Sequence, residues 1–141
     1  MSCIFCKIIA GEAEASKIYE DDDILAFMDV FPVRKGQVLV IPKTHVDHFS
    51  DLPEDLATKV FQKAHEISKK VRIKLNPERV GLLVHGYGVS HAHLIVIPLY
   101  DKDDITHAGM AKIKDGKIIF TMEDYKMADR EELDKLAQEL K

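Results

Sequence analysis

The order of the predicted strands and helices is the feature that most constrains the fold of this chain. Three segments rich in β-branched and aromatic residues, 17–20, 24–30 and 37–42, are predicted strands and come before any long helix. A long amphipathic helix is predicted near residues 53–75. Its apolar stripe, which we expect to face the core, consists of Leu56, Val60, Phe61, Ala64, Ile67, Val71 and Leu75.

Shorter predicted elements complete the pattern. They are a short N-terminal helix over 4–10 ending at Gly11, strands over 79–84 and 91–97, a small hairpin over 112–120, and a closing helix over 129–140 with Asp129 and Glu132 in capping-box positions. Strands in runs with one helix between them favour an α+β fold over a βαβ arrangement. We therefore expect an antiparallel sheet of about five strands, one long central helix and short terminal helices.

The length and the charge of the chain limit the number of domains and the kinds of binding partner that we expect. The 141 residues predict one domain over 1–141, with a motif-bearing core over 3–100 and a C-terminal extension over 101–141. Acidic residues outnumber basic ones, 24 to 20, which argues against a broad basic face that binds nucleic acid. No apolar run approaches the roughly 20 residues that cross a bilayer, and the N-terminus lacks a basic leader. We expect a cytoplasmic protein without a nucleic-acid or membrane partner.

The two cysteines of the chain, Cys3 and Cys6, have the spacing at which both thiolates can bind one tetrahedral metal ion. Zinc would need two more ligands, for which the sequence offers the candidates His45, His48, His85 and His91. The alternatives are two small buried side chains, a redox pair and a disulfide. A reducing cytoplasm disfavours the disulfide, and a redox pair would follow a strand for which two residues leave no room.

A second histidine cluster lies in the predicted strand over 91–97. Alternation places His91, His93 and Ile95 on one face of that strand, and Ala92, Leu94 and Val96 on the other, which we expect to face the core. Two histidines side by side on a rigid strand can form a chemical site. The alternative is a pair of half-exposed histidines without a function.

Five motifs along the chain resemble those of the histidine triad family of nucleotide hydrolases and transferases, in order and in spacing. They are Cys3-Ile-Phe-Cys6-Lys-Ile-Ile-Ala-Gly-Glu12, Tyr19-Glu-Asp, Leu25-Ala-Phe-Met-Asp29, Gly36-Gln-Val-Leu-Val-Ile-Pro-Lys-Thr-His45, and Gly88-Val-Ser-His91-Ala-His93 with Pro98. The resemblance covers roughly residues 3–100. It implies an antiparallel sheet with helices, usually paired as a homodimer.

The resemblance also implies a mechanism and a metal site. The middle histidine of the family motif, His93 here, would attack the α-phosphate of a nucleoside phosphoramidate or a dinucleoside polyphosphate, and water would then hydrolyse the nucleotidyl-histidine. One ring nitrogen of His93 must be free, and the other needs an acceptor, commonly a backbone carbonyl. The family's ligand set for a structural zinc with a closed coordination shell maps onto Cys3, Cys6, His45 and His91.

A purine nucleotide or a nucleotide derivative is the ligand that the resemblance implies. By position, the nucleotide-binding residues are Ile4, Phe5, Ile8, Phe27 and Leu39 around the base, Asp29 at the ribose hydroxyls, and also His85 and Val89. For each apolar side chain in this set, a plain core position is the alternative.

The chain departs from the family pattern at three places that we expect to lie near the phosphate. Ile95 replaces the third motif histidine, Gln37 replaces the histidine after the glycine, and a shortened loop places Tyr87 and Gly88 where glutamine and serine are usual. Loss of one preorganised donor typically costs about 100-fold to 1,000-fold in rate. Two hypotheses follow: a hydrolase that acts through His93, or a zinc-stabilised nucleotide-binding module with weak or no catalysis.

Overall fold

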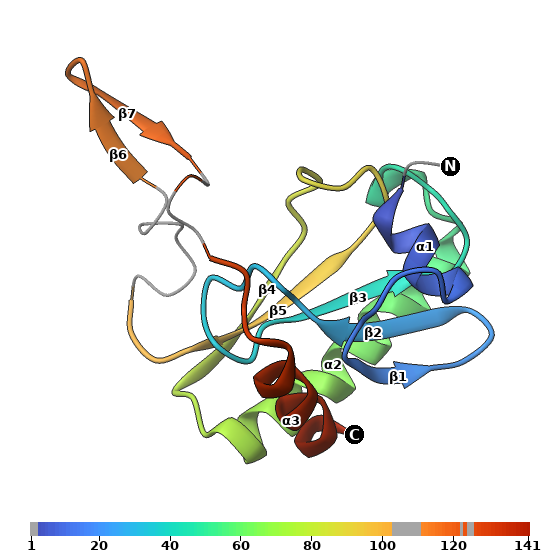
Figure 1. The fold of residues 1–141 in the computed structure, drawn as a ribbon. Coiled ribbons are helices and arrows are strands. Elements are labelled where there is room, and N and C mark those ends of the chain that lie inside the picture. Colours follow the sequence, from blue (N-terminus) through green and yellow to red (C-terminus); the bar gives the residue numbers. More distant parts are fainter. Residues whose placement is uncertain (1–2, 103–110, 122, 124–125) are drawn as a thin grey trace.

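The computed structural model describes residues 3–102, 111–121, 123 and 126–141 (Figure 1). Its helices are α1 (Ile4–Ala10), α2 (Glu54–Leu75) and α3 (Arg130–Leu140), with a 3-10 turn, η1, at Phe49–Asp51. The main sheet contains β1 (Lys17–Glu20), β2 (Ile24–Met28), β3 (Val38–Pro42), β4 (Arg79–Leu83) and β5 (Leu94–Leu99). All of its strand pairs are antiparallel, in the order β1-β2-β3-β5-β4, which confirms the predicted α+β fold.

Alternate residues of the sheet face two different layers. One face packs on α2 and α3, and its strand residues include Ala26, Met28, Val38, Val40, Leu94 and Val96. The other face packs on α1, and its strand residues are Leu25, Phe27, Leu39, Ile41, Ile95 and Ile97. Every residue of β2 and β3 is buried because both faces of these central strands are covered.

The long helix agrees with the prediction except at one position of its stripe. Its buried residues are Val60, Ala64, Ile67 and Val71. Phe61, which the periodicity placed toward the core, is instead 46% exposed and packs edge-to-face on the ring of Phe49 in η1. Among the described residues, no helix is both long enough and apolar enough to cross a bilayer.

The last strand of the sheet begins later than predicted, at Leu94 rather than at His91. The backbone N–H of His91 donates to the carbonyl of Val89, and that of Ala92 donates to the carbonyl of Val46, so neither takes part in a strand ladder. His91 and His93 therefore lie in the segment that leads into β5.

The C-terminal extension contributes its final helix to the main core. As predicted, Asp129 caps α3, because its Oδ1 accepts from the N–H of Glu132 at 3.1 Å. The buried Ser16 donates to Asp134 of α3 at 2.5 Å. The predicted hairpin also forms, as β6 (Ala111–Lys114) and β7 (Lys117–Phe120), and stands apart from the main sheet (Figure 1). Residues 103–110, 122 and 124–125 of the extension lie outside the described residues.

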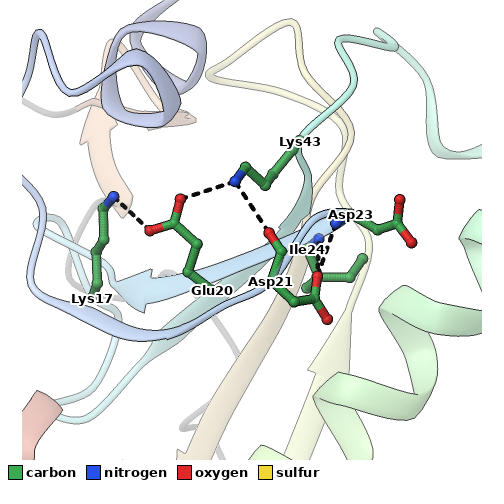
Figure 2. A network of polar contacts seen from close by, with 6 residues as sticks. All are labelled: Lys17, Glu20, Asp21, Asp23, Ile24 and Lys43. Atoms are coloured by element: carbon green, nitrogen blue, oxygen red, sulfur yellow. Dashed lines mark hydrogen bonds and ion pairs between the residues drawn. The ribbon is translucent and has the colours of Figure 1, made fainter.

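A polar network ties the turn between β1 and β2 to the end of β3 (Figure 2). Asp21 Oδ1 accepts from the N–H groups of Asp23 and Ile24, which closes the turn. Lys43 donates to Glu20 at 3.0 Å and to the carbonyl of Asp21 at 3.1 Å. Lys17 and Lys43 lower the pKa of Glu20 by donating to its carboxylate. The network thereby anchors the chain just before His45.

Candidate functional site

Four side chains from three separate segments of the chain meet at one end of the sheet: Cys3, Cys6, His45 and His91. Cys3 is the N-cap residue of α1, and Cys6 lies in its first turn. The Sγ atoms of the cysteines and the Nδ1 atoms of the histidines all lie within 4.8 Å of one another. Helix α1 ends at Gly11, whose φ of 77° is in the left-handed region that favours glycine.

The spacing of these atoms fits one tetrahedral zinc ion. Bonds of about 2.3 Å to sulfur and about 2.0–2.1 Å to nitrogen place S and N about 3.6 Å apart, and two N atoms about 3.3 Å apart. The observed separations are 3.6 Å for Cys3–His91, 3.3 Å for Cys6–His45, 3.7 Å for Cys6–His91 and 3.3 Å between the two Nδ1 atoms. The donor set and the distances therefore fit a possible four-ligand metal site.

The ring of His91 is held in the tautomer that a metal ligand needs. Its Nε2–H donates to the carbonyl of Pro42 at 2.8 Å, so the Nδ1 lone pair faces the other three ligands. The side chain is fully buried, and burial lowers the pKa of His91, which keeps the ring neutral at pH 7. Burial also raises the pKa of the Cys6 thiol, so metal binding has to displace its proton.

His93 is oriented by the segment that carries the metal-site histidine. Its Nδ1–H donates to the carbonyl of His91 at 2.7 Å, as expected for a fixed tautomer. In the neutral ring this leaves the lone pair on Nε2. His93 is 6% exposed, and its ring meets Phe5 of α1 edge-to-face, with 5.6 Å between the ring centroids.

A cavity of about 890 Å³ lies beside His93, between α1 and the sheet. All eight residues assigned to nucleotide binding from the sequence line it: Ile4, Phe5, Ile8, Phe27, Asp29, Leu39, His85 and Val89. Its volume is in the range of small-molecule sites. The structure thus brings the whole predicted set together around one space, with apolar walls and few polar groups.

The strand register places the polar groups at two opposite ends of this cavity. Its floor is a row of paired residues, Phe27 with Leu39 and Leu39 with Ile95. His93 lies two residues before Ile95, and Gln37 lies two residues before Leu39. Because β3 and β5 are antiparallel, His93 and Gln37 are offset by about 13 Å along the strands.

Asp29 and Gln37 form the polar end that lies opposite His93. Gln37 Nε2 donates to Asp29 Oδ2 at 2.6 Å, and the N–H of Phe31 donates to Asp29 Oδ1 at 2.9 Å. Gln37 Oε1 accepts from the N–H of Val33 at 2.9 Å. The Gln37 amide is thus turned toward Asp29 at the far end of the floor from His93, and the expectation that it lies near the phosphate stays a prediction.

Comparison with known proteins decides the family. The HIT domain model matches residues 10–102. The chain belongs to the histidine triad (HIT) family. It is 40% identical over 108 residues to the protein hit of Bacillus subtilis, covering 73% of this chain and 74% of that protein.

Two solved histidine triad structures share the fold over almost the whole chain. A zinc-bound histidine triad family protein from Mycobacterium smegmatis has a TM-score of 0.76 at 28% identity, covering 99% of this chain and 93% of that one. A hypothetical histidine triad nucleotide-binding protein from Sulfolobus tokodaii has a TM-score of 0.78 at 27% identity, covering 98% and 89%.

Among the positions at which this chain differs from the histidine triad pattern, Ile95 is the one most relevant to His93. This side chain lies on the cavity floor, next along the chain on the face that carries His93, and it offers no donor. In the shortened loop, His85 and Tyr87 line the cavity, and their rings are 5.3 Å apart. Tyr87 is 79% exposed, so the loop is open to solvent at this point.

Two residues of the cavity wall lie outside the part matched by the HIT domain model and were missed from the sequence: Met127 and Arg130. The N–H of Ala128 donates to the carbonyl of Val30, which lays this segment beside β2. Arg130 Nη1 donates to Ser16 Oγ at 3.1 Å. The capping signal at Asp129 predicted a helix start, and nothing in the sequence indicated that this start reaches the cavity.

Proposed function

We propose that this protein is a nucleotide-binding hydrolase of the histidine triad type, acting on nucleoside phosphoramidates or dinucleoside polyphosphates through His93. The orientation of His93 carries the proposal: Nδ1–H is held by the carbonyl of His91, and the Nε2 lone pair is left for attack beside the cavity. A neutral imidazole is a competent nucleophile near pH 7. The nucleotide-binding description of the Sulfolobus tokodaii neighbour is consistent with it.

The reaction would proceed in two displacements at the α-phosphorus. Nε2 of His93 attacks and an N–P bond forms. The bond from phosphorus to the amine or to the remaining phosphates breaks, and a departing amine takes up a proton from solvent water. The ring then carries a positive charge, and the bond from Nδ1–H to the carbonyl of His91 stabilises it. Water next attacks phosphorus and the N–P bond breaks, which releases a nucleoside monophosphate, returns one proton to solvent and regenerates neutral His93.

The cavity residues suggest how the nucleotide would lie. The apolar side chains of α1 and of the floor would hold the purine, and Asp29 would accept from the ribose hydroxyls. His85 and Val89 in the short loop would lie by the nucleotide, with His85 supplying part of the missing polar contacts. The apolar floor row and the carboxylate at its end support this placement.

We also propose a structural zinc ion bound by Cys3, Cys6, His45 and His91, with a closed shell and no position for substrate. When bound, zinc would supply four strong bonds that fasten α1 to the segment before β5. The tetrahedral spacing of the donor atoms supports it. Thiolate metal ligands suit a reducing compartment, so we place the protein in the cytoplasm.

A direct test of the hydrolase proposal is to incubate the protein with adenosine 5′-phosphoramidate and search for a covalent intermediate. We expect turnover to AMP, and a rapidly quenched sample should contain a nucleotidyl group that peptide mapping assigns to His93. Absence of both turnover and adduct would leave the binding-module alternative.

The binding-module alternative is favoured by one observation, the isoleucine at the third histidine position. If the missing donor limits turnover, Ile95→His should raise kcat by about 100-fold, because a ring N–H would enter the cavity beside His93. Hydrolysis of adenosine 5′-phosphoramidate measures this, and Ile95→Leu is the matched control that keeps the floor apolar. Unchanged turnover in Ile95→His would show that position 95 does not limit catalysis.

We further propose a homodimer formed through β4, which lies at the edge of the main sheet within the described residues. Apolar side chains are exposed beside this edge: Leu82 on β4, Val84 just after it, and Phe61 on α2. Phe61 and Leu82 line one shallow groove. An unpaired strand edge with apolar flanks suits pairing with a second copy.

Light scattering coupled to size exclusion tests the dimer. We expect twice the 16.0 kDa chain mass for the wild type and a shift toward the monomer in Leu82→Lys. Ile73→Lys is the matched control, since Ile73 is 76% exposed and lies outside the groove. A wild-type protein that remains at the single-chain mass would contradict the proposal.

A further inference from the structure

Gln37 is a buried amide that holds a carboxylate at the cavity. Gln37 is only 3% exposed. Its Nε2–H donates to the Asp29 carboxylate, and its Oε1 accepts from the backbone N–H of Val33. The backbone is joined at the same point, because the N–H of Asp29 donates to the carbonyl of Gln37 at 3.0 Å. Asp29 is thus fixed relative to β3 by two separate bonds.

The two contacts of the Gln37 amide have different consequences. The bond from Val33 braces the loop between β2 and β3, and any acceptor at position 37 could serve it. The bond to Asp29 orients the carboxylate, and it requires a donor at position 37. A carboxylate offers about four acceptor sites, and Gln37 and the Phe31 N–H each donate to a different oxygen of Asp29.

The end of the cavity with Asp29 and Gln37 lies far enough from His93 to contact a different part of a ligand. The offset of about 13 Å along the strands separates Gln37 from His93, the residue that would attack phosphorus. A carboxylate at this end is suited to donors, such as the paired hydroxyls of a ribose. The preference of the cavity for ribose over sugars without these hydroxyls would then depend on how rigidly the Asp29 carboxylate is oriented.

We propose that Gln37 is a positioning residue that makes the cavity select ligands with the vicinal 2′ and 3′ hydroxyls of ribose, by holding the Asp29 carboxylate toward them. This inference rests on the proposed nucleotide-binding function and on the proposed contact of Asp29 with the ribose hydroxyls. It assigns to Gln37 a task at the sugar, where the family pattern has a histidine.

Calorimetric titration of the full, zinc-loaded chain with AMP and with 2′,3′-dideoxyadenosine 5′-monophosphate tests the proposal. For the wild type we expect AMP to bind about 30-fold to 100-fold more tightly, as two hydrogen bonds to a charged acceptor allow. Gln37→Met, which keeps the side-chain length and removes both polar atoms, should reduce this ratio to about 3-fold or less. Gln37→Glu at pH 8 keeps the acceptor for Val33, removes the donor to Asp29, and should reduce the ratio equally.

Val40→Ala is the control for lost stability, because Val40 is buried on the opposite face of β3 and should leave the ratio unchanged. If the affinities for both ligands fall together in the Gln37 variants and the ratio stays, Gln37 only braces the loop and the inference is overturned. Equal binding of both ligands by the wild type overturns it as well. If the wild type binds neither ligand, the proposed nucleotide binding fails together with this inference.

Discussion

Replacing His93 by alanine should abolish hydrolysis of adenosine 5′-phosphoramidate, with a loss of about 10⁴-fold or more, because the reaction loses its nucleophile. Binding of AMP should change far less, since His93 is one of many residues that line the cavity. The measurement is turnover by chromatography together with the intact mass of the quenched protein. We expect the variant to show no nucleotidyl adduct.

The matched control for this prediction is His48→Ala. His48 lies outside the metal-site cluster, and its side chain is 66% exposed, so its loss should leave turnover unchanged. A folded His93→Ala variant that turns over at the wild-type rate would contradict the role of His93. Equal losses in the His48 and His93 variants would indicate a general loss of structure rather than of a nucleophile.

The sequence predicted the layers of the fold because its patterns are local. The stripe on α2, the capping residue Asp129 and the glycine that ends α1 each depend on a few neighbouring residues. The start of β5 was placed too early, because the bonds that divert His91 and Ala92 come from Val89 and Val46 in loops. Hydrogen bonds to loop residues such as these leave no periodic pattern in the sequence.

The sequence predicted most residues that line the candidate site, but it predicted less of how their side chains are arranged. Motif order indicated which residues meet, and all eight predicted nucleotide-binding residues do line one cavity. The direction of the Gln37 side chain was not predictable, because it depends on the register of β2 against β3, which aligns Asp29 with Gln37. Arg130 was missed because its place at the cavity follows from the packing of α3 on the sheet.

Purified protein should contain about one zinc ion per chain, and Cys3→Ala should lose both the ion and much of the thermal stability. The ligands come from α1, from the loop after β3 and from the segment before β5, so the ion would join three parts of the chain that no disulfide links. A ligand that binds only the folded state stabilises it by mass action. Structural zinc sites in small peptides contribute about 10–16 kcal/mol, so loss of one thiolate should lower the Tm by roughly 10 °C or more.

Elemental analysis and thermal unfolding, each with and without a chelator, measure this effect. Cys6→Ala should behave like Cys3→Ala, whereas His48→Ala, three residues beyond the ligand His45, should keep both zinc and Tm. Because Ile4, Phe5 and Ile8 of α1 also line the cavity, zinc loss should weaken AMP binding as well as stability. Protein that is purified without metal, and whose Tm is unchanged in Cys3→Ala, would refute the zinc site while leaving the role of His93 to its own test.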